Sequence, residues 1–137
     1  MAGETTSVAA SSAFRIPKGV AVGMVGVPFT LTFSTTQNEL NDVMEAGYLP
    51  ANVIVVGALV KSDDMDSNGS PAVVHKITVG STDIVTGITA AQSGGQAVYA
   101  CTPLTLTAKT LVKVQTTTAA ATAAAGSMYV TLLVINK

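Results

Sequence analysis

The stretch Asn52–Gly80, NVIVVGALVKSDDMDSNGSPAVVHKITVG, places two apolar segments on either side of a polar one. The first segment, residues 52–60, is apolar at nearly every position, which is typical of a strand covered on both faces. The second, residues 72–80, is rich in β-branched residues and predicts another strand. Because the dipeptide Asn68-Gly69 favours a tight turn, the pattern predicts a hairpin whose strands are joined through residues 62–71.

The rest of the chain supplies further strand candidates. In PFTLTFST, residues 28–35, Phe29, Leu31 and Phe33 alternate with hydroxyl-bearing residues, as in a half-buried strand. The other candidates are VAVGMVGV (20–27, bent at its glycines), QAVYAC (96–101), PLTLT (103–107), TLVKVQTTT (110–118) and SMYVTLLVIN (127–136). About eight short strands predict an all-β fold, an antiparallel β-sandwich, and a jelly-roll arrangement would close that count.

Three segments do not fit a strand pattern. Residues 1–13 are small and polar and predict a flexible N-terminal arm before a single β-sandwich domain over residues 14–137. Residues 38–46 predict a helical turn that Gly47 ends. TAAATAAAGS, residues 118–127, is interpreted as a hairpin connection of small residues, with a short helix as the alternative because alanine favours helix.

The amino-acid composition indicates which partners and which compartment to expect. Hydrophobic residues make up 48% of the chain and charged residues 11%, against about 25% charged in an average soluble domain. Much of the surface is therefore expected to face other protein. The net charge of −1 and the scattered basic residues argue against a nucleic-acid partner, and the apolar runs are far shorter than the roughly 20 residues of a membrane span. The N-terminus lacks the pattern of a signal peptide and Cys101 is the only cysteine, so we expect no export and no internal disulfide.

The polar stretch begins like a calcium-binding loop. Asp64, Asp66 and Asn68 occupy positions one, three and five of such a loop, and the glycine of position six follows. Position twelve should be a bidentate glutamate but is His75, a poor ligand for a hard cation. We therefore interpret the stretch as a turn with solvated aspartates and assign no metal ligand, with Asp64, Asp66 and Asn68 as the candidates if a cation binds.

The sequence contains few candidate catalytic residues. His75 shares a strand face with apolar residues and is expected to be a buried or interface histidine with one hydrogen-bond partner. Cys101 is expected to be a small core residue at the end of a strand, although a Cys101–His75 nucleophilic pair stays open. Glu39, Asp42 and Glu45 would share a solvated face of the predicted helical turn. We predict no catalytic residue, no cofactor and no enzymatic activity.

Two segments carry a resemblance. GYLPANVIVVGALVKSDDMDSNGSPAVVHKITVG and TTAAATAAAGSMYVTLLVI resemble small virion proteins of tailed bacteriophages, and the likeness covers roughly residues 47–79 and 116–135. The shared pattern is a Leu-Pro start, an apolar strand, an aspartate-rich polar stretch, a return strand and a small-residue connection before the last strand. The closest likeness is to capsid decoration, or cement, proteins.

This resemblance implies a function. It implies a structural protein, made in the host cytoplasm, that binds the outside of an assembled phage head and stabilises it. Its partners would be the major capsid protein and further copies of itself. The expected homo-oligomer is a trimer in preference to a dimer. The rival interpretations are a tail or fibre component of the virion and a calcium-dependent binding module or small hydrolase that uses the Asp64 loop or Cys101.

Overall fold

The computed structural model describes residues 23–137, so the predicted arm over residues 1–13 and the domain start at residue 14 lie outside it. Eight strands and one short 3-10 helix make up the described chain. In chain order they are β1 (Val25–Phe33), β2 (Val43–Leu49), β3 (Val53–Ser62), β4 (Val74–Val79), β5 (Thr82–Ile88), η1 (Ala90–Gln92), β6 (Gly95–Leu106), β7 (Thr110–Thr118) and β8 (Gly126–Asn136).

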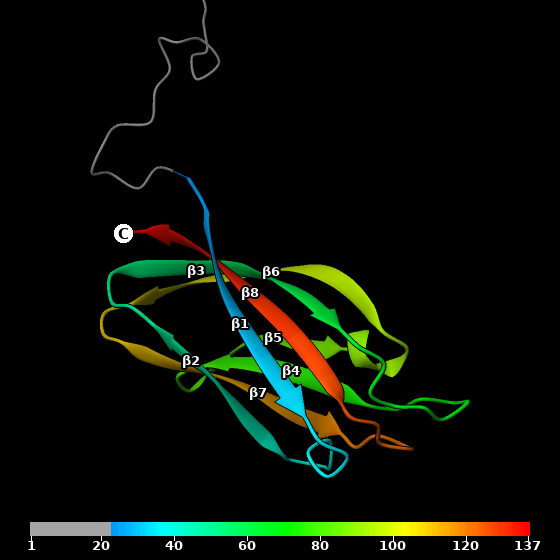
Figure 1. Cartoon of the computed structure of the whole chain (residues 1–137). Coiled ribbons are helices and arrows are strands. Elements are labelled where there is room, and N and C mark those ends of the chain that lie inside the picture. Colours follow the sequence, from blue (N-terminus) through cyan, green and yellow to red (C-terminus); the bar gives the residue numbers. More distant parts are fainter. Residues whose placement is uncertain (1–22) are drawn as a thin grey trace, which may run out of the picture.

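The strands form two four-stranded antiparallel sheets. Sheet A has the order β1-β8-β3-β6, and sheet B has the order β2-β7-β4-β5. Figure 1 shows the two sheets stacked as layers of a sandwich. The prediction of an all-β antiparallel sandwich of about eight strands is confirmed.

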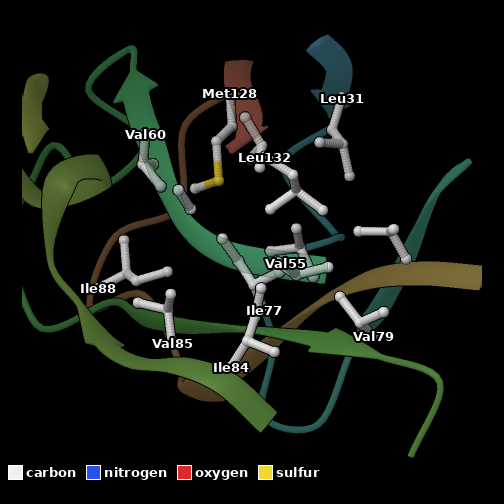
Figure 2. Close-up of a cluster of buried hydrophobic side chains, with 14 of the residues drawn as sticks. Leu31, Val55, Val60, Ile77, Val79, Ile84, Val85, Ile88, Met128 and Leu132 are labelled. Atoms are coloured by element: carbon white, nitrogen blue, oxygen red, sulfur yellow. The ribbon is translucent and has the colours of Figure 1, made fainter. Parts of the chain in front are cut away.

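The core lies between the two sheets and follows from the alternation of side chains along each strand. In β8, Met128 and Leu132 are fully buried, whereas the intervening Tyr129 is largely exposed. Figure 2 shows apolar side chains of both sheets, including Leu132 of sheet A and Ile77 of sheet B, directed into the same cluster. Full burial of a Val, Leu or Ile side chain contributes about 1.5–3 kcal/mol, so this cluster is the main stabilising element of the fold.

The predicted hairpin of residues 52–60 with residues 72–80 is wrong. The first segment is β3, between β8 and β6 of sheet A, as expected of a central strand, but the second is β4 of sheet B. Residues 63–73 therefore cross from one sheet to the other. Asn68-Gly69 forms a local turn within this crossover instead of a hairpin turn. In it the Asn68 side chain accepts a hydrogen bond of 2.8 Å from the Ser70 amide.

The interpretation of residues 118–127 as a hairpin connection is also wrong. The preceding strand, β7, belongs to sheet B and the following strand, β8, belongs to sheet A. Residues 119–125 form neither helix nor strand ladder. The intrinsic helix preference of alanine amounts to less than about 1 kcal/mol per residue, and hydrogen bonds from this segment to the β3–β4 crossover outweigh it.

The helical turn predicted over residues 38–46 is not formed. Asn41 has a φ of 70°, in the left-handed region, which interrupts a helix at that point. The chain then pairs with β7 as β2, and Glu45 lies in that strand, so Glu39, Asp42 and Glu45 share no helical face. Asp42 instead accepts a hydrogen bond of 2.9 Å from the Glu39 amide within a turn.

Two strand predictions differ at their boundaries. QAVYAC and PLTLT belong to one strand, β6, and Cys101 lies inside it rather than at its end. Pro103 does not divide them, because β6 is an edge strand and proline is tolerated there. VAVGMVGV and PFTLTFST, predicted as two strands, likewise form one strand, β1, which begins at Val25; residues 20–22 lie outside the described chain.

Candidate functional site

Asp66 is the centre of a junction between three connections. We call this site the crossover junction, and it consists of residues 34–42, 63–73 and 119–125. Figure 1 shows these connections at the same end of the sandwich. Asp66 is only 1% exposed, so its carboxylate has left bulk water.

The carboxylate of Asp66 accepts hydrogen bonds from five backbone amides. Its Oδ1 receives Asn68 at 3.3 Å and Thr122 at 2.9 Å, and its Oδ2 receives Ala72 at 2.7 Å, Val73 at 3.2 Å and Ala121 at 2.9 Å. Burying a charge is costly unless it is hydrogen-bonded in this way. Asp66 thereby joins its own crossover to the β7–β8 crossover.

Backbone contacts strengthen this joint. Asp66 and Ala123 form an antiparallel bridge, the Ser67 amide donates to the Thr122 carbonyl at 2.9 Å, and the Ala124 amide donates to the Met65 carbonyl at 3.0 Å. The two motifs on which the resemblance depends, DDMDSNGSP and TTAAATAAAG, are therefore in direct contact. The sequence does not show that contact, because the two motifs are separated by four strands.

The electrostatics of Asp66 follow from these contacts. Burial acts to raise the pKa of Asp66, but the amides of Ala72, Thr122, Ala121 and Val73 stabilise the charged form and hold the pKa well below its ordinary value. Asp66 is therefore ionised at neutral pH, and its negative charge is neutralised by amide dipoles rather than by a basic side chain. The expectation of solvated aspartates is wrong for this residue.

His75 lies in the core beside the junction. It is 0% exposed, its Nε2 is 2.7 Å from Asn38 Oδ1, and its ring lies 5.6 Å from that of Phe33. The prediction of a buried histidine with one hydrogen-bond partner is confirmed. Burial lowers the pKa of His75 to about 4, so the imidazole is neutral at pH 7. Its Nδ1 is buried without a hydrogen-bond partner among the described residues.

Asn38 attaches the β1–β2 connection to the other two connections of the junction. It is 1% exposed, and its side-chain Nδ2 lies 3.8 Å from Met65 Sδ. Its backbone carbonyl accepts a hydrogen bond of 3.0 Å from the Ala120 amide. One buried amide side chain thus contacts His75 of the core and a residue of the β3–β4 crossover. The role of Asn38 was not predicted from the sequence, because its position was interpreted as the first residue of a helical turn.

The candidate metal ligands are directed at the backbone. Asp64 Oδ1 accepts the Asp66 amide at 3.0 Å, and the Asn68 side chain accepts the Ser70 amide and donates to Thr122 Oγ1 at 3.0 Å. Over residues 23–137 no cluster of three or more His, Cys, Asp or Glu side chains is arranged to hold a metal ion. What the geometry does provide is a set of successive Asx turns that shape the crossover.

The structure does not bring Cys101 and His75 together. Cys101 lies in β6 of sheet A and its Sγ is 3.7 Å from the Val55 carbonyl, whereas His75 lies in β4 of sheet B and contacts Asn38. Burial raises the pKa of the Cys101 thiol, which disfavours the reactive thiolate.

In the described part of the chain the single helix is η1, three residues long, and no helix could span a membrane.

Comparisons with known proteins find a similar fold in chains of two phage capsid structures. The chain matches a chain of a structure described as the cyanophage Pam1 capsid asymmetric unit with a TM-score of 0.77 and 23% identity, covering 96% of this chain and 98% of that chain. It matches a chain of the capsid of Ralstonia phage GP4 with a TM-score of 0.73 and 20% identity, covering 90% of each chain. No protein-family model matches the chain, and no curated protein matches it.

These likenesses establish a shared fold over nearly the whole chain. Both of these structural neighbours come from phage capsids, which agrees with the resemblance of the sequence to tailed-phage virion proteins.

Proposed function

We propose that this protein is a capsid decoration protein that binds the outside of an assembled phage head and stabilises it. The observation that carries the proposal is the fold shared over 96% of the chain with a chain of the Pam1 capsid. The resemblance of residues 47–79 and 116–135 to decoration proteins supports it from the sequence. The main partner would be the major capsid protein, and the protein would reside on the head surface.

We further infer a jelly-roll class and a homo-oligomer. The orders β1-β8-β3-β6 and β2-β7-β4-β5 place chain-distant strands side by side, and every strand pair except β4–β5 joins strands that are not consecutive in the chain. This interleaving supports a jelly roll of two Greek keys. A trimer is preferred to a dimer, because the resemblance implies small symmetric oligomers around the local axes of a shell.

A structural role without catalysis fits the side chains that could have been reactive. His75 is buried with its Nε2 against Asn38, and Cys101 is half-buried with a raised pKa. Neither contacts the other, and Asp66 has its carboxylate occupied by backbone amides. These residues stabilise the fold, and no contact among them prepares a nucleophile.

The stabilisation would act by multivalent binding. An oligomer that contacts several capsid subunits binds its later contacts at high effective concentration, so each single contact can be weak. Since the oligomer would bind the assembled shell and not free subunits, binding shifts the equilibrium toward assembly by mass action. With only 11% charged residues, the binding should depend weakly on salt.

Purified particles of the phage that encodes the chain provide the test. Quantitative mass spectrometry should find the chain in many copies per particle, and particles that lack it should release DNA at lower temperature or under milder osmotic shock. A chain present in only a few copies at the tail would favour the tail or fibre interpretation. A chain absent from particles would contradict any virion role.

A further inference from the structure

The outer faces of the two sheets differ in their chemistry. The outer face of sheet B is charged: Glu45 of β2 lies opposite Lys113 of β7 in register, and Lys76 Nζ forms an ion pair of 3.1 Å with Asp83. Charged pairs at half-exposed positions are typical of a surface that faces water.

The outer face of sheet A is nearly free of charge and exposes several large apolar side chains. Leu59 is 40% exposed, Val98 70% and Tyr129 45%, and Lys61 is the only charged residue in the four strands of this sheet. We call the outward surface of the three neighbouring strands β6, β3 and β8 the apolar face. Its apolar members are Ile54, Leu59, Val98, Tyr129, Leu133 and Ile135, and its uncharged polar members include Gln96, Thr105 and Thr131.

The apolar face is continuous across the strands. In register, Ile135 of β8 lies opposite Ile54 of β3, and Leu59 of β3 lies opposite Val98 of β6. Around Leu59 and Val98 the surface has a hollow of about 440 Å³, and Lys61, Gln96, Tyr129 and Thr131 also line it. Side chains of a partner could enter this hollow next to the protruding valine and tyrosine.

The face is large enough for a specific interface. Three strands spaced about 4.8 Å apart and paired over about nine residues of 3.3 Å give a projected area of roughly 430 Å². The relief of the side chains raises the accessible area above this value, toward the roughly 500 Å² that each partner contributes to the smallest specific interfaces. The largest apolar patch on a monomer, typically about 300–600 Å², is often functional.

We propose that the apolar face of sheet A is the surface that docks on the assembled shell, and this inference rests on the proposed function. The partner surface must be apolar and uncharged opposite Leu59 and Val98, because an unpaired charge there would lose its hydration. At the rim it must offer a carboxylate or carbonyl oxygen to Lys61, the single positive charge of the face.

A second copy of the chain is the weaker occupant. Face-to-face pairing of identical surfaces is isologous and closes at two copies, so it cannot build the trimer inferred above. In a trimer that forms through other surfaces, the three apolar faces stay free. The shell can then bind them together, which provides the multivalency that weak single contacts require.

Two valines provide a matched test. Val98 on β6 and Val43 on β2 are both exposed, at 70% and 49%, and both lie on edge strands, but of opposite sheets. Wild type, Val98→Lys, Leu59→Lys and Val43→Lys would each be added to particles that lack the chain, and bound copies counted by mass spectrometry. We expect about tenfold or greater loss of binding affinity for Val98→Lys and Leu59→Lys, and wild-type binding for Val43→Lys.

Each alternative result has its own meaning. Melting curves of the free variants should match wild type, and Val98, the more exposed residue, keeps the test valid if Leu59→Lys fails to fold. If wild type does not bind particles at all, the proposed function itself is wrong. If wild type binds and Val98→Lys binds equally well, the docking surface is wrong while the function stands. If light scattering shows that Val98→Lys dissociates an oligomer in solution, a second copy covers the face and the proposal is overturned.

Discussion

The Asp66 carboxylate accepts a hydrogen bond of 2.9 Å from the backbone amide of Thr122, 56 residues further along the chain. This contact joins two crossovers that connect sheets A and B at the same end of the sandwich. Because neither crossover has a strand ladder of its own, an ionised side chain supplies the acceptors that their backbone amides need.

Replacement of Asp66 should therefore be strongly destabilising. Asp66→Ala leaves up to five backbone amides without their acceptor in a buried site, and we expect the free energy of unfolding to fall by about 3–5 kcal/mol. Asp64→Ala, an exposed neighbour that accepts one amide, is the control and should cost about 1 kcal/mol or less. Urea denaturation of both variants measures the difference, and equal losses would contradict the role assigned to Asp66.

His75 predicts a loss of stability in mild acid. Its pKa is lowered to about 4 in the folded protein, against about 6.5 in the unfolded chain, so the unfolded state binds the extra proton between these values. The contribution of neutral His75 to the free energy of unfolding is then fully present above pH 6.5. Between pH 6.5 and pH 4 that free energy falls by about 1.4 kcal/mol per pH unit. In His75→Gln this slope should be absent, even if the variant is less stable overall. Denaturation curves collected from pH 4 to 7 test it, and an unchanged slope in the variant would assign the effect to another group.

Asp66 predicts a second, more acidic transition. Its pKa is held below the ordinary value of about 4, so its contribution is present above pH 4 and is lost as the pH falls further. Wild type should continue to lose stability below pH 4, and Asp66→Ala should lose less over that range. Acid titration followed by circular dichroism would show the difference, since Asp66→Ala lacks the titrating group.

Most of the strands could be predicted from the sequence because their signal is local, but β2, which was interpreted as part of a helical turn, and β5 were not. The alternation of Phe29, Leu31 and Phe33, and the unbroken apolar run of β3, depend only on neighbouring residues and on burial. The partner of each strand could not be predicted in this way. Two apolar strands joined by a loop containing Asn-Gly satisfy the pattern of a hairpin as well as that of a crossover, and only pairing with distant strands distinguishes the two.

The crossover junction could not be predicted from the sequence for a related physical reason. Asp66 lies in a polar run that resembles a solvated turn, and its burial depends on a crossover that follows much later in the chain. The alanine-rich crossover has few polar side chains to show that its amides need an acceptor. His75 could be predicted, because its burial follows from the apolar residues on its own strand face.

We expect the crossover to fold without calcium. Asp66 has no oxygen free of amide contacts, and Asp64 and Asn68 accept amides of their own. A site filled at about 100 times its dissociation constant would add about 2.7 kcal/mol of stability. Melting in excess Ca²⁺ and in chelator should instead agree within about 1 °C, far less than that energy would produce in a chain of this size. An increase with Ca²⁺ that Asp64→Ala abolishes would show a resident cation.

The bulge in β3 makes the fold sensitive to any side chain at Gly57. The register of β3 shifts between Val55 and Gly57 against both of its neighbours, which brings the Gly57 backbone close to β6. A Cβ added at Gly57 would lie 2.5 Å from the Tyr99 carbonyl oxygen, a backbone atom that cannot move without breaking the β3–β6 pairing. Gly57→Ala should therefore lower the free energy of unfolding by about 1–3 kcal/mol through overpacking. Gly69→Ala is the matched control, since a Cβ there meets no atom within 4 Å and its backbone is not left-handed. Thermal melting of the two variants should separate them by several degrees, and a wild-type melting temperature for Gly57→Ala would show that the bulge can relax.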